Sequence, residues 1–303
     1  MADAVSRSDA VFTVREALIR GTEYLTRHDI RGARLDAELV LAHVLETDRL
    51  HVYLNLDEPL SVAERDASRE LLMRRAKHEP LAYILGTRDF MGRAFRVCPG
   101  VLIPRPETEL LVEWAHELLP SYFPEEAAGG AWRVLEIGCG SGCICVSFAD
   151  TWRDSLVTAT DISPTAVRVT RENAEAFDVS SRIDIRQQGD FSGLPDGAFH
   201  AILSNPPYIA VGDRDSLMPD VRDYEPAEAL FAGADGLDVI RQLLSEGSRL
   251  LLPGGFLLIE IGCGQGSAVE ALATDLEFVE VRKDYAGLDR MALWRRRASE
   301  NGA

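Results

Sequence analysis

The residues best suited to chemistry lie in the tetrapeptide Asn205-Pro206-Pro207-Tyr208, which follows the apolar run HAILS. The two prolines fix φ and remove two N–H donors, so the carbonyl of Pro206 can face a ligand instead of joining a strand ladder. Asn205 adds a side-chain carbonyl acceptor. Together these acceptors can take both hydrogens of an NH₂ group while Tyr208 stacks on its planar surface. The pattern predicts a site that presents a planar amide or amine nitrogen, and the alternative is a Pro-Pro strand terminator.

A glycine-rich turn follows the apolar run VLEI. Gly138, Gly140 and Gly142 let a ligand approach the backbone, and glycine permits the angles of a sharp strand-to-helix turn. Cys143 stands where a dinucleotide-binding fold would have its third glycine, next to a bound pyrophosphate. The turn therefore suits a nucleoside without phosphates, such as S-adenosylmethionine. A plain tight turn is the alternative.

Acidic residues follow the next two expected strands. Asp161 ends the run LVTAT 19 residues after Gly142, close to the spacing at which a carboxylate binds ribose hydroxyls. Asp190 and Phe191 follow the run IDIRQQ and could bind the amino group and the ring face of an adenine. The structural alternatives are a helix N-cap at Asp161 or Ser163 and a core position for Phe191.

These features predict methyl transfer from S-adenosylmethionine, with S-adenosylhomocysteine as the product. The reaction is an in-line displacement that depends on placement more than on a strong base. Near-attack positioning can lower such a barrier by roughly 7–11 kcal/mol. No His, Cys or Lys nucleophile is required.

A second glycine turn, IEIGCGQG at residues 259–266, nearly repeats the first. No strand ending in an acid follows it at the expected spacing. We therefore assign the donor to the first turn and expect the second to be structural.

The apolar periodicity divides the chain into parts. From about residue 12 to 78 it is helical, so we expect a helical domain over residues 1–80. Its clearest stretch places on one face Ala37, Val40, Leu41, Val44 and Leu45. Turn residues and prolines in residues 81–105 favour a hairpin-like linker.

Residues 106–303 are expected to form an α/β domain. Pro106 suits the first turn of a helix that buries Leu111, Trp114, Ala115 and Leu118. The expected strands are Arg133–Ile137, Leu156–Thr160, Ile183–Gln187, Ala201–Ser204, Phe256–Ile261, Phe278–Val281 and Met291–Trp294. Helical stretches between most of them imply a mostly parallel sheet covered on both faces. Ligands bind such sheets at the carboxyl ends of the strands.

Composition limits the remaining function classes. With 46% hydrophobic and 27% charged residues, no apolar run of about 20 residues and no signal peptide, a cytoplasmic globular protein is expected. The five cysteines include no CxxC pair, so we expect reduced thiols and no metal site. The formal charge of −17 argues against direct nucleic-acid binding and suits a cationic cofactor or a basic protein partner.

In their order along the chain, these elements resemble a class I (Rossmann-like) methyltransferase with a seven-stranded, mostly parallel sheet and a small N-terminal helical domain. From about residue 15 to 295 the chain resembles the HemK/PrmC family of protein-(glutamine-N5) methyltransferases, which modify peptide chain release factors. The resemblance is carried by RLDAELVLAHVL, EPLAYILGTRDFMG, LIPRPETE, VLEIGCGSG, SNPPYI, DVRDYEPAEALFAG and GLDVIRQLL.

The resemblance implies a target and a set of site residues. The target is the side-chain amide nitrogen of the glutamine in the Gly-Gly-Gln loop of class I release factors. The implied donor contacts are Gly138, Cys139, Gly140, Ser141, Gly142, Asp161, Phe191 and Asn205. We add Asp190 to these contacts because it directly precedes Phe191. The implied substrate clamp is Asn205, Pro206, Pro207 and Tyr208, of which Asn205, Pro206 and Tyr208 are the expected catalytic residues.

Two positions depart from the family pattern. Many relatives have Trp where this chain has Phe191, which weakens the expected stacking. His200 stands where an acid commonly precedes the tetrapeptide, and we expect it to be an exposed turn residue without a catalytic role.

Three other functions fit part of the pattern. A related enzyme that methylates a ribosomal-protein glutamine shares the tetrapeptide, but RLDAELVLAHVL favours the release-factor branch. DNA adenine-N6 methyltransferases use a related tetrapeptide, but this chain is acidic and has no evident target-recognition domain. A binding module for translation factors is the third, and a Gly138→Asp variant that loses the donor but keeps its partner would separate docking from catalysis. We expect a monomer whose helical domain docks the release factor.

Overall fold

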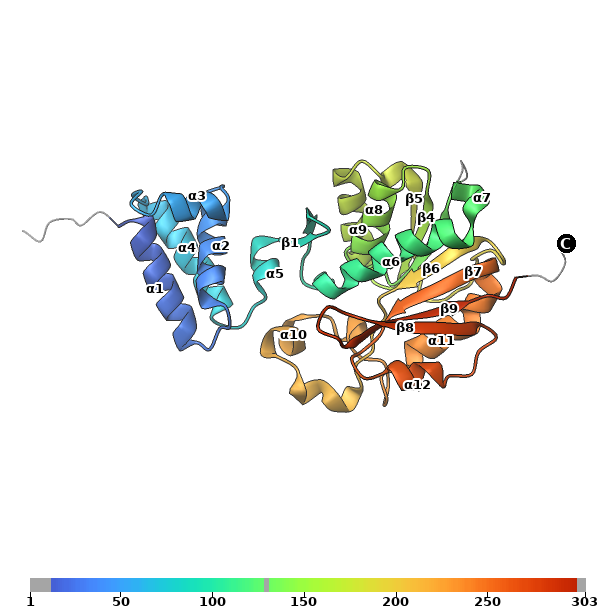
Figure 1. The fold of residues 1–303 in the computed structure, drawn as a ribbon. Coiled ribbons are helices and arrows are strands. Elements are labelled where there is room, and N and C mark those ends of the chain that lie inside the picture. The colour runs from blue at the N-terminus through green and yellow to red at the C-terminus, as the bar shows by residue number, and fades with distance from the viewer. Residues whose placement is uncertain (1–11, 128–130, 299–303) are drawn as a thin grey trace, which may run out of the picture. The chain divides into compact units, whose positions relative to one another are not determined.

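The computed structural model describes residues 12–127 and 131–298, which form two compact units divided between Gly86 and Thr87 (Figure 1). The first unit is helical, as expected. Its helices are α1 (Val14–Arg27), α2 (Ala33–Val44), α3 (Arg49–Leu54), α4 (Val62–Arg75) and α5 (Leu81–Leu85).

Ion pairs to two buried carboxylates help to connect the helices of this first unit. Asp36 of α2 accepts a 2.7 Å hydrogen bond from Nε of Arg75 in α4, and both residues are buried. Glu38, also buried, accepts bonds of 2.9 and 2.6 Å from Arg34 and Arg49. The apolar core around them includes Val14, Leu18, Ala37, Leu41 and Val52. The charged residues of the RLDAEL segment therefore serve packing within this unit.

The second unit contains an antiparallel hairpin and a seven-stranded sheet. The hairpin pairs β1 (Thr87–Phe90) with β2 (Arg93–Arg96). The sheet has the order β5-β4-β3-β6-β7-β9-β8. Its strands are β3 (Arg133–Ile137), β4 (Leu156–Asp161), β5 (Ile183–Gln187), β6 (Phe199–Ser204), β7 (Leu251–Glu260), β8 (Glu277–Lys283) and β9 (Asp289–Arg295). Only β9 runs antiparallel to its neighbours β7 and β8, which confirms the expected mostly parallel sheet.

Every expected strand overlaps an observed one, but β7 begins five residues earlier than expected. Its first part includes Pro253, Gly254 and Gly255, which the sequence pattern marks as a turn. The pairing with β6 shifts register there, from Phe199 opposite Leu251 to the next pair. Such a bulge lets proline and glycine lie within a strand without a regular ladder.

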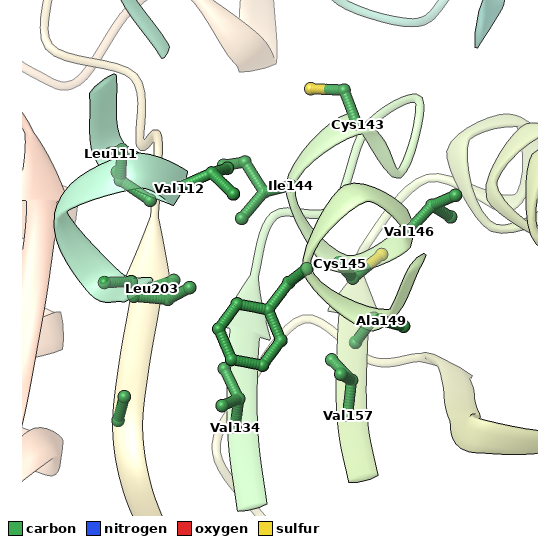
Figure 2. Close-up of a cluster of buried hydrophobic side chains, with 14 of the residues drawn as sticks. Leu111, Val112, Val134, Cys143, Ile144, Cys145, Val146, Ala149, Val157 and Leu203 are labelled. Atoms are coloured by element: carbon green, nitrogen blue, oxygen red, sulfur yellow. The ribbon is translucent and has the colours of Figure 1, made fainter. Parts of the chain in front are cut away.

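Helices cover both faces of the sheet, and neighbouring strand residues point to opposite faces. On one face, α6 (Pro106–Tyr122), α8 (Cys143–Thr151) and α9 (Pro164–Ala176) contribute to the core that includes Val134 and Leu203. Figure 2 shows part of this core, with Val112 of α6 beside Ile144 of α8. On the other face, α11 (Asp238–Leu250) packs near Leu135.

The helix predicted to start at Pro106 is confirmed, because α6 has Pro106 in its first turn and buries Leu111, Trp114, Ala115 and Leu118. The remaining helical segments are α7 (Pro124–Ala127), α10 (Pro219–Tyr224), α12 (Gly266–Glu270) and 3₁₀ turns at Ser180–Arg182, Val211–Ser216 and Ala227–Ala229. Within residues 12–127 and 131–298, no helix has the length and apolar character to cross a membrane.

The expectation for His200 was wrong, because this residue is buried in β6 and only 3% exposed. Its Nδ1 accepts a 3.0 Å hydrogen bond from the backbone N–H of Arg133 in β3. Its ring lies edge-on to the rings of Phe123 and Trp132. Strand β6 starts two residues before its expected start, which brings His200 into the sheet.

Candidate functional site

A cavity of about 310 Å³ lies in the second unit at the carboxyl ends of β3, β4, β5 and β6. This volume is at the lower end of the range of roughly 300–1,000 Å³ for ligand pockets. The wall combines the first glycine turn, the end of β4, the segment after β5, the loop after β6 and residues 100–108. The site therefore lies where ligands bind open parallel sheets.

The first glycine turn borders open space at two of its glycines. Gly138 and Cys139 donate backbone hydrogen bonds of 2.8 and 3.0 Å to the carbonyl of Thr160, and Gly140 donates one of 2.8 Å to Asp161 Oδ2. Gly138 and Gly140 have φ of +76° and +57°, and within the described chain no atom beyond the adjoining residues lies within 4 Å of a Cβ added at either. The turn thus forms an open cradle whose shape is set by the end of β4.

Gly142 serves packing instead. It has φ of +78°, begins α8 as its N-cap, and a Cβ there would lie 2.7 Å from Thr170 Cγ2 of α9. Thr170 also donates a 3.1 Å hydrogen bond to the carbonyl of Gly140, and Asn173 donates one of 2.8 Å to the carbonyl of Ser141. Helix α9 therefore supports the turn from behind.

Asp161 connects the glycine turn to the next helix. Its Oδ2 accepts from Gly140 N–H and its Oδ1 from Ser163 N–H, both at 2.8 Å. The N-cap of α9 is Ser163, whose hydroxyl accepts from Ala166 N–H. Burial raises the pKa of Asp161. Each carboxylate oxygen has a second lone pair, so Asp161 can still accept from ligand hydroxyls at the cavity wall.

Asp190 and Phe191 line the cavity beyond the end of β5. Asp190 Oδ1 accepts from the hydroxyl and the N–H of Ser192 at 2.6 and 3.1 Å, and the hydroxyl in particular lowers the pKa of Asp190. Phe191 is half-buried and packs against the core between the sheet and α11. Phe191 thus combines a core position with a place on the wall.

The loop after β6 brings the tetrapeptide to the same cavity. Strand β6 ends at Ser204, whose hydroxyl donates a 2.7 Å bond to the carbonyl of Ile137 in β3. Asn205, Pro206 and Pro207 line the cavity.

Tyr208 is held from two sides. Its hydroxyl donates to Glu260 Oε1 at 3.1 Å. Its carbonyl accepts a 3.0 Å bond from Gln265 Nε2, while Gln265 Oε1 accepts from Gly262 N–H at 2.8 Å. The second glycine turn therefore supports the tetrapeptide loop.

The structure thus brings most of the expected site residues to one wall, namely Gly138, Cys139, Gly140, Ser141, Asp161, Asp190, Phe191, Asn205, Pro206 and Pro207. Of the expected residues, all of which the structure describes, Gly142 and Tyr208 do not line the cavity.

Several residues at or next to the wall were not singled out in the sequence. Glu136 lines the cavity, its Oε2 accepts from Cys145 N–H at 2.9 Å, and burial raises its pKa to about 8. Thr108 of α6 also lines the cavity, and its hydroxyl oxygen accepts a 3.0 Å hydrogen bond from Nδ2 of Asn205. An acid in the apolar run VLEI was the available signal for Glu136, because an unpaired charge is costly in a buried strand.

A further ion pair joins two segments of the family resemblance. Arg105 Nη2 donates to Glu225 Oε1 at 2.6 Å, and Ile103 N–H donates to Glu225 Oε2 at 3.2 Å. Glu225 is buried and Arg105 lies on the cavity wall. The LIPRPETE and DYEPAEAL segments therefore meet beside the site.

Comparisons with known proteins agree with this fold. The family model described as PrmC N-terminal domain matches residues 16–86, and the methyltransferase small domain matches residues 111–219. The catalytic domain of hMettl16 in complex with the MAT2A 3′UTR hairpin 6 has a similar fold, with a TM-score of 0.51, 15% sequence identity, and coverage of 77% of this chain and 84% of that chain.

Two curated relatives extend the similarity to almost the full chain. The release factor glutamine methyltransferase of Geobacter sulfurreducens is 40% identical over 283 residues, covering 93% of this chain and 96% of that protein. The protein of the same name from Nitratidesulfovibrio vulgaris is 39% identical over 290 residues, covering 94% and 95%. Since the similarity includes both the helical unit and the cavity-bearing unit, this chain belongs to the release factor glutamine methyltransferase family.

Proposed function

We propose that this chain transfers a methyl group from S-adenosylmethionine to the side-chain amide nitrogen of the glutamine in the Gly-Gly-Gln loop of class I release factors. The observation that carries the proposal is the single cavity wall shared by the open glycine turn, Asp161 and Asn205–Pro207. The names of the relatives, which align along nearly their full length, support the protein substrate.

The wall residues fit the methyl donor. Gly138 and Gly140 leave open space beside the backbone, and Asp161 can accept from ribose hydroxyls. Asp190 and Phe191 extend the same wall toward the place expected for the adenine. Asp161 places a carboxylate on the wall, which suits a donor that carries sulfonium and ammonium charges. The bound donor supplies an electrophilic methyl group.

The loop after β6 is proposed to hold the acceptor. Asn205 Oδ1 and the carbonyl of Pro206 take the two hydrogens of the glutamine amide, so the nitrogen faces the donor. Tyr208, anchored on Glu260, completes the clamp with Pro207. Such placement can supply roughly 7–11 kcal/mol of barrier reduction without a strong base.

The proposal includes a monomeric enzyme in the cytoplasm, where translation takes place. All residues of the cavity wall come from one unit of one chain, which supports a monomer. The net charge of −17 supports a protein substrate rather than direct nucleic-acid binding.

Mass spectrometry of a class I release factor, after incubation with the chain and S-adenosylmethionine, tests this function. We expect one methyl group on the Gly-Gly-Gln glutamine. The Asn205→Ala variant should stay folded, with an unchanged thermal transition, while its kcat falls by roughly 100-fold or more. Near-normal turnover of Asn205→Ala would contradict the clamp, and methylation of only a ribosomal-protein glutamine or DNA adenine would contradict the proposed substrate.

A further inference from the structure

A buried carboxylate lies directly behind the tetrapeptide loop. Glu260 ends β7 and is 1% exposed. Its Oε2 accepts a 2.6 Å hydrogen bond from the hydroxyl of Thr108, and its Oε1 accepts one of 3.1 Å from the hydroxyl of Tyr208. Helix α6 and the loop after β6 therefore meet on one side chain that is not on the cavity wall.

The protons of this network can be counted. The hydroxyl of Thr108 has one proton, which it donates to Glu260. Its Oγ1 can then only accept from Asn205, whose side-chain amide lies 3.0 Å away. The amide must present Nδ2 to Thr108, which leaves Oδ1 as its acceptor. The oxygen and nitrogen of an amide are assigned from such networks, and here the assignment follows from the proton count.

We infer that Thr108 and Glu260 are positioning residues that hold the Asn205 amide with Oδ1 as the acceptor for the NH₂ group of the substrate glutamine. The inference rests on the proposed function, because it names what orients the acceptor in that clamp. With the amide reversed, Nδ2 of Asn205 would face the NH₂ group of the substrate, so two donors would meet and neither would be satisfied.

The network has this direction when Glu260 is ionised, because its carboxylate then accepts at both oxygens. Burial raises the pKa of Glu260, and Glu107 adds to the rise, whereas Thr108, Arg290 and Tyr208 oppose it. The acid form keeps this direction when its proton lies on Oε1, where Glu260 donates to Tyr208 and Oε2 still accepts from Thr108. A proton on Oε2 would instead make Glu260 the donor to Thr108 and let Thr108 donate to Asn205 Oδ1.

Paired variants at Thr108 test the kinetic consequence. Thr108→Val keeps the volume but removes the hydroxyl, and we expect kcat for the release factor to fall roughly 10- to 100-fold. Its KM for the intact release factor should change much less than kcat, because docking of the factor is proposed to lie in residues 1–86. Thr108→Ser restores the hydroxyl and should recover most of the lost kcat. Equal kcat values for the two variants would overturn the inference.

A double variant separates positioning from a merely structural role. Glu260→Leu removes the acceptor, so the Thr108 hydroxyl can donate to Asn205 Oδ1 and reverse the amide. Because both residues act through Asn205, Thr108→Val combined with Glu260→Leu should be no slower than the slower single variant. If the double variant is folded and its loss of kcat equals the product of the two single losses, the two residues do not act through Asn205 together. If Glu260→Leu does not fold, the Thr108 pair still decides.

Neutron diffraction of the deuterium-exchanged full chain reads the orientation without any turnover. We expect deuterium on Nδ2 of Asn205 directed at Thr108, and deuterium on Oγ1 of Thr108 directed at Glu260. Oδ1 of Asn205 facing Thr108 would overturn the inference even if the enzyme methylates its release factor. Conversely, absence of methylation by the wild-type chain with the expected deuterium positions would count against the proposed function alone.

Discussion

Two buried glutamates, Glu136 and Glu260, lie at the ends of the strands that flank β6, and their charges are compensated differently. Glu260 accepts hydrogen bonds from two hydroxyls. Glu136 accepts a hydrogen bond from Cys145 N–H and lies near the carboxylate of Asp161, which raises the pKa of Glu136 further. A buried carboxylate with little compensation favours its protonated form.

Glu136 should therefore make stability depend on pH. Its pKa of about 8 lies above the ordinary 4.5, so its contribution to folding is complete below pH 4.5 and is lost as the pH rises to about 8. Glu136→Gln stays neutral and keeps an acceptor for Cys145. We expect its thermal transition to lie roughly 5–10 °C above that of wild type near pH 9 and to approach it near pH 5, measured by circular dichroism.

The comparison across pH is the control for this prediction. A substitution that changed only packing would shift the transition equally at every pH. Parallel curves for the two proteins would therefore show that Glu136 is ionised in the folded chain throughout this range.

Among the elements, the turn between β3 and α8 combines two tasks in a few residues. Gly138 and Gly140 border open space, whereas Gly142 lies against Thr170 of α9. All three have positive φ, so each prefers glycine for its backbone. The three glycines differ in what an added Cβ would meet, which is open space at Gly138 and Gly140 and Thr170 at Gly142.

Alanine at Gly142 should therefore mainly lower stability, whereas alanine at Gly140 should mainly weaken donor binding. Gly142→Ala should lower the free energy of unfolding by roughly 2–4 kcal/mol, because backbone strain adds to overlap with Thr170. Gly140→Ala should cost only about 1 kcal/mol but should weaken S-adenosylmethionine binding by roughly 10-fold or more, because the added methyl enters the cradle. Denaturant unfolding and calorimetric titration measure the two effects. Unchanged donor affinity in Gly140→Ala would remove the turn from the proposed donor site.

At the scale of the whole molecule, the chain separates substrate docking from chemistry in our proposal. The cavity and the Asn205–Thr108–Glu260 network lie within residues 87–303. Residues 16–86 match the PrmC N-terminal domain and have their own core and a buried ion pair between Asp36 and Arg75. We propose that this helical unit docks the release factor.

Removal of residues 1–86 should then raise the KM for an intact release factor by roughly 10-fold or more. The Kd for S-adenosylmethionine should stay within about twofold. A short Gly-Gly-Gln peptide lacks the docking surface of the factor and serves as the control substrate. The truncated chain should methylate this peptide at the same rate as the full chain. Parallel losses of donor binding and peptide methylation would reject the division of labour.

Much of this architecture follows from local patterns in the sequence. The apolar strands, the glycine turn and the proline pair are each encoded within a few consecutive residues, and parallel strands bring their carboxyl ends to one edge. The sequence therefore determined the sheet, the place of the cavity and most of its wall, including Asp161 and Asn205. His200 shows the limit of local patterns, since a polar residue at a strand end resembles a turn until its partner in β3 is known.

Only the tertiary structure decided which residues orient the Asn205 side chain. Thr108 and Glu260 are 152 positions apart, and Thr108 and Asn205 are 97 apart. A hydrogen bond across such separations has no periodicity or spacing that a local pattern could reveal. Packing of α6 beside the ends of β6 and β7 brings the three side chains together, and the proton count among them sets the direction of the Asn205 amide.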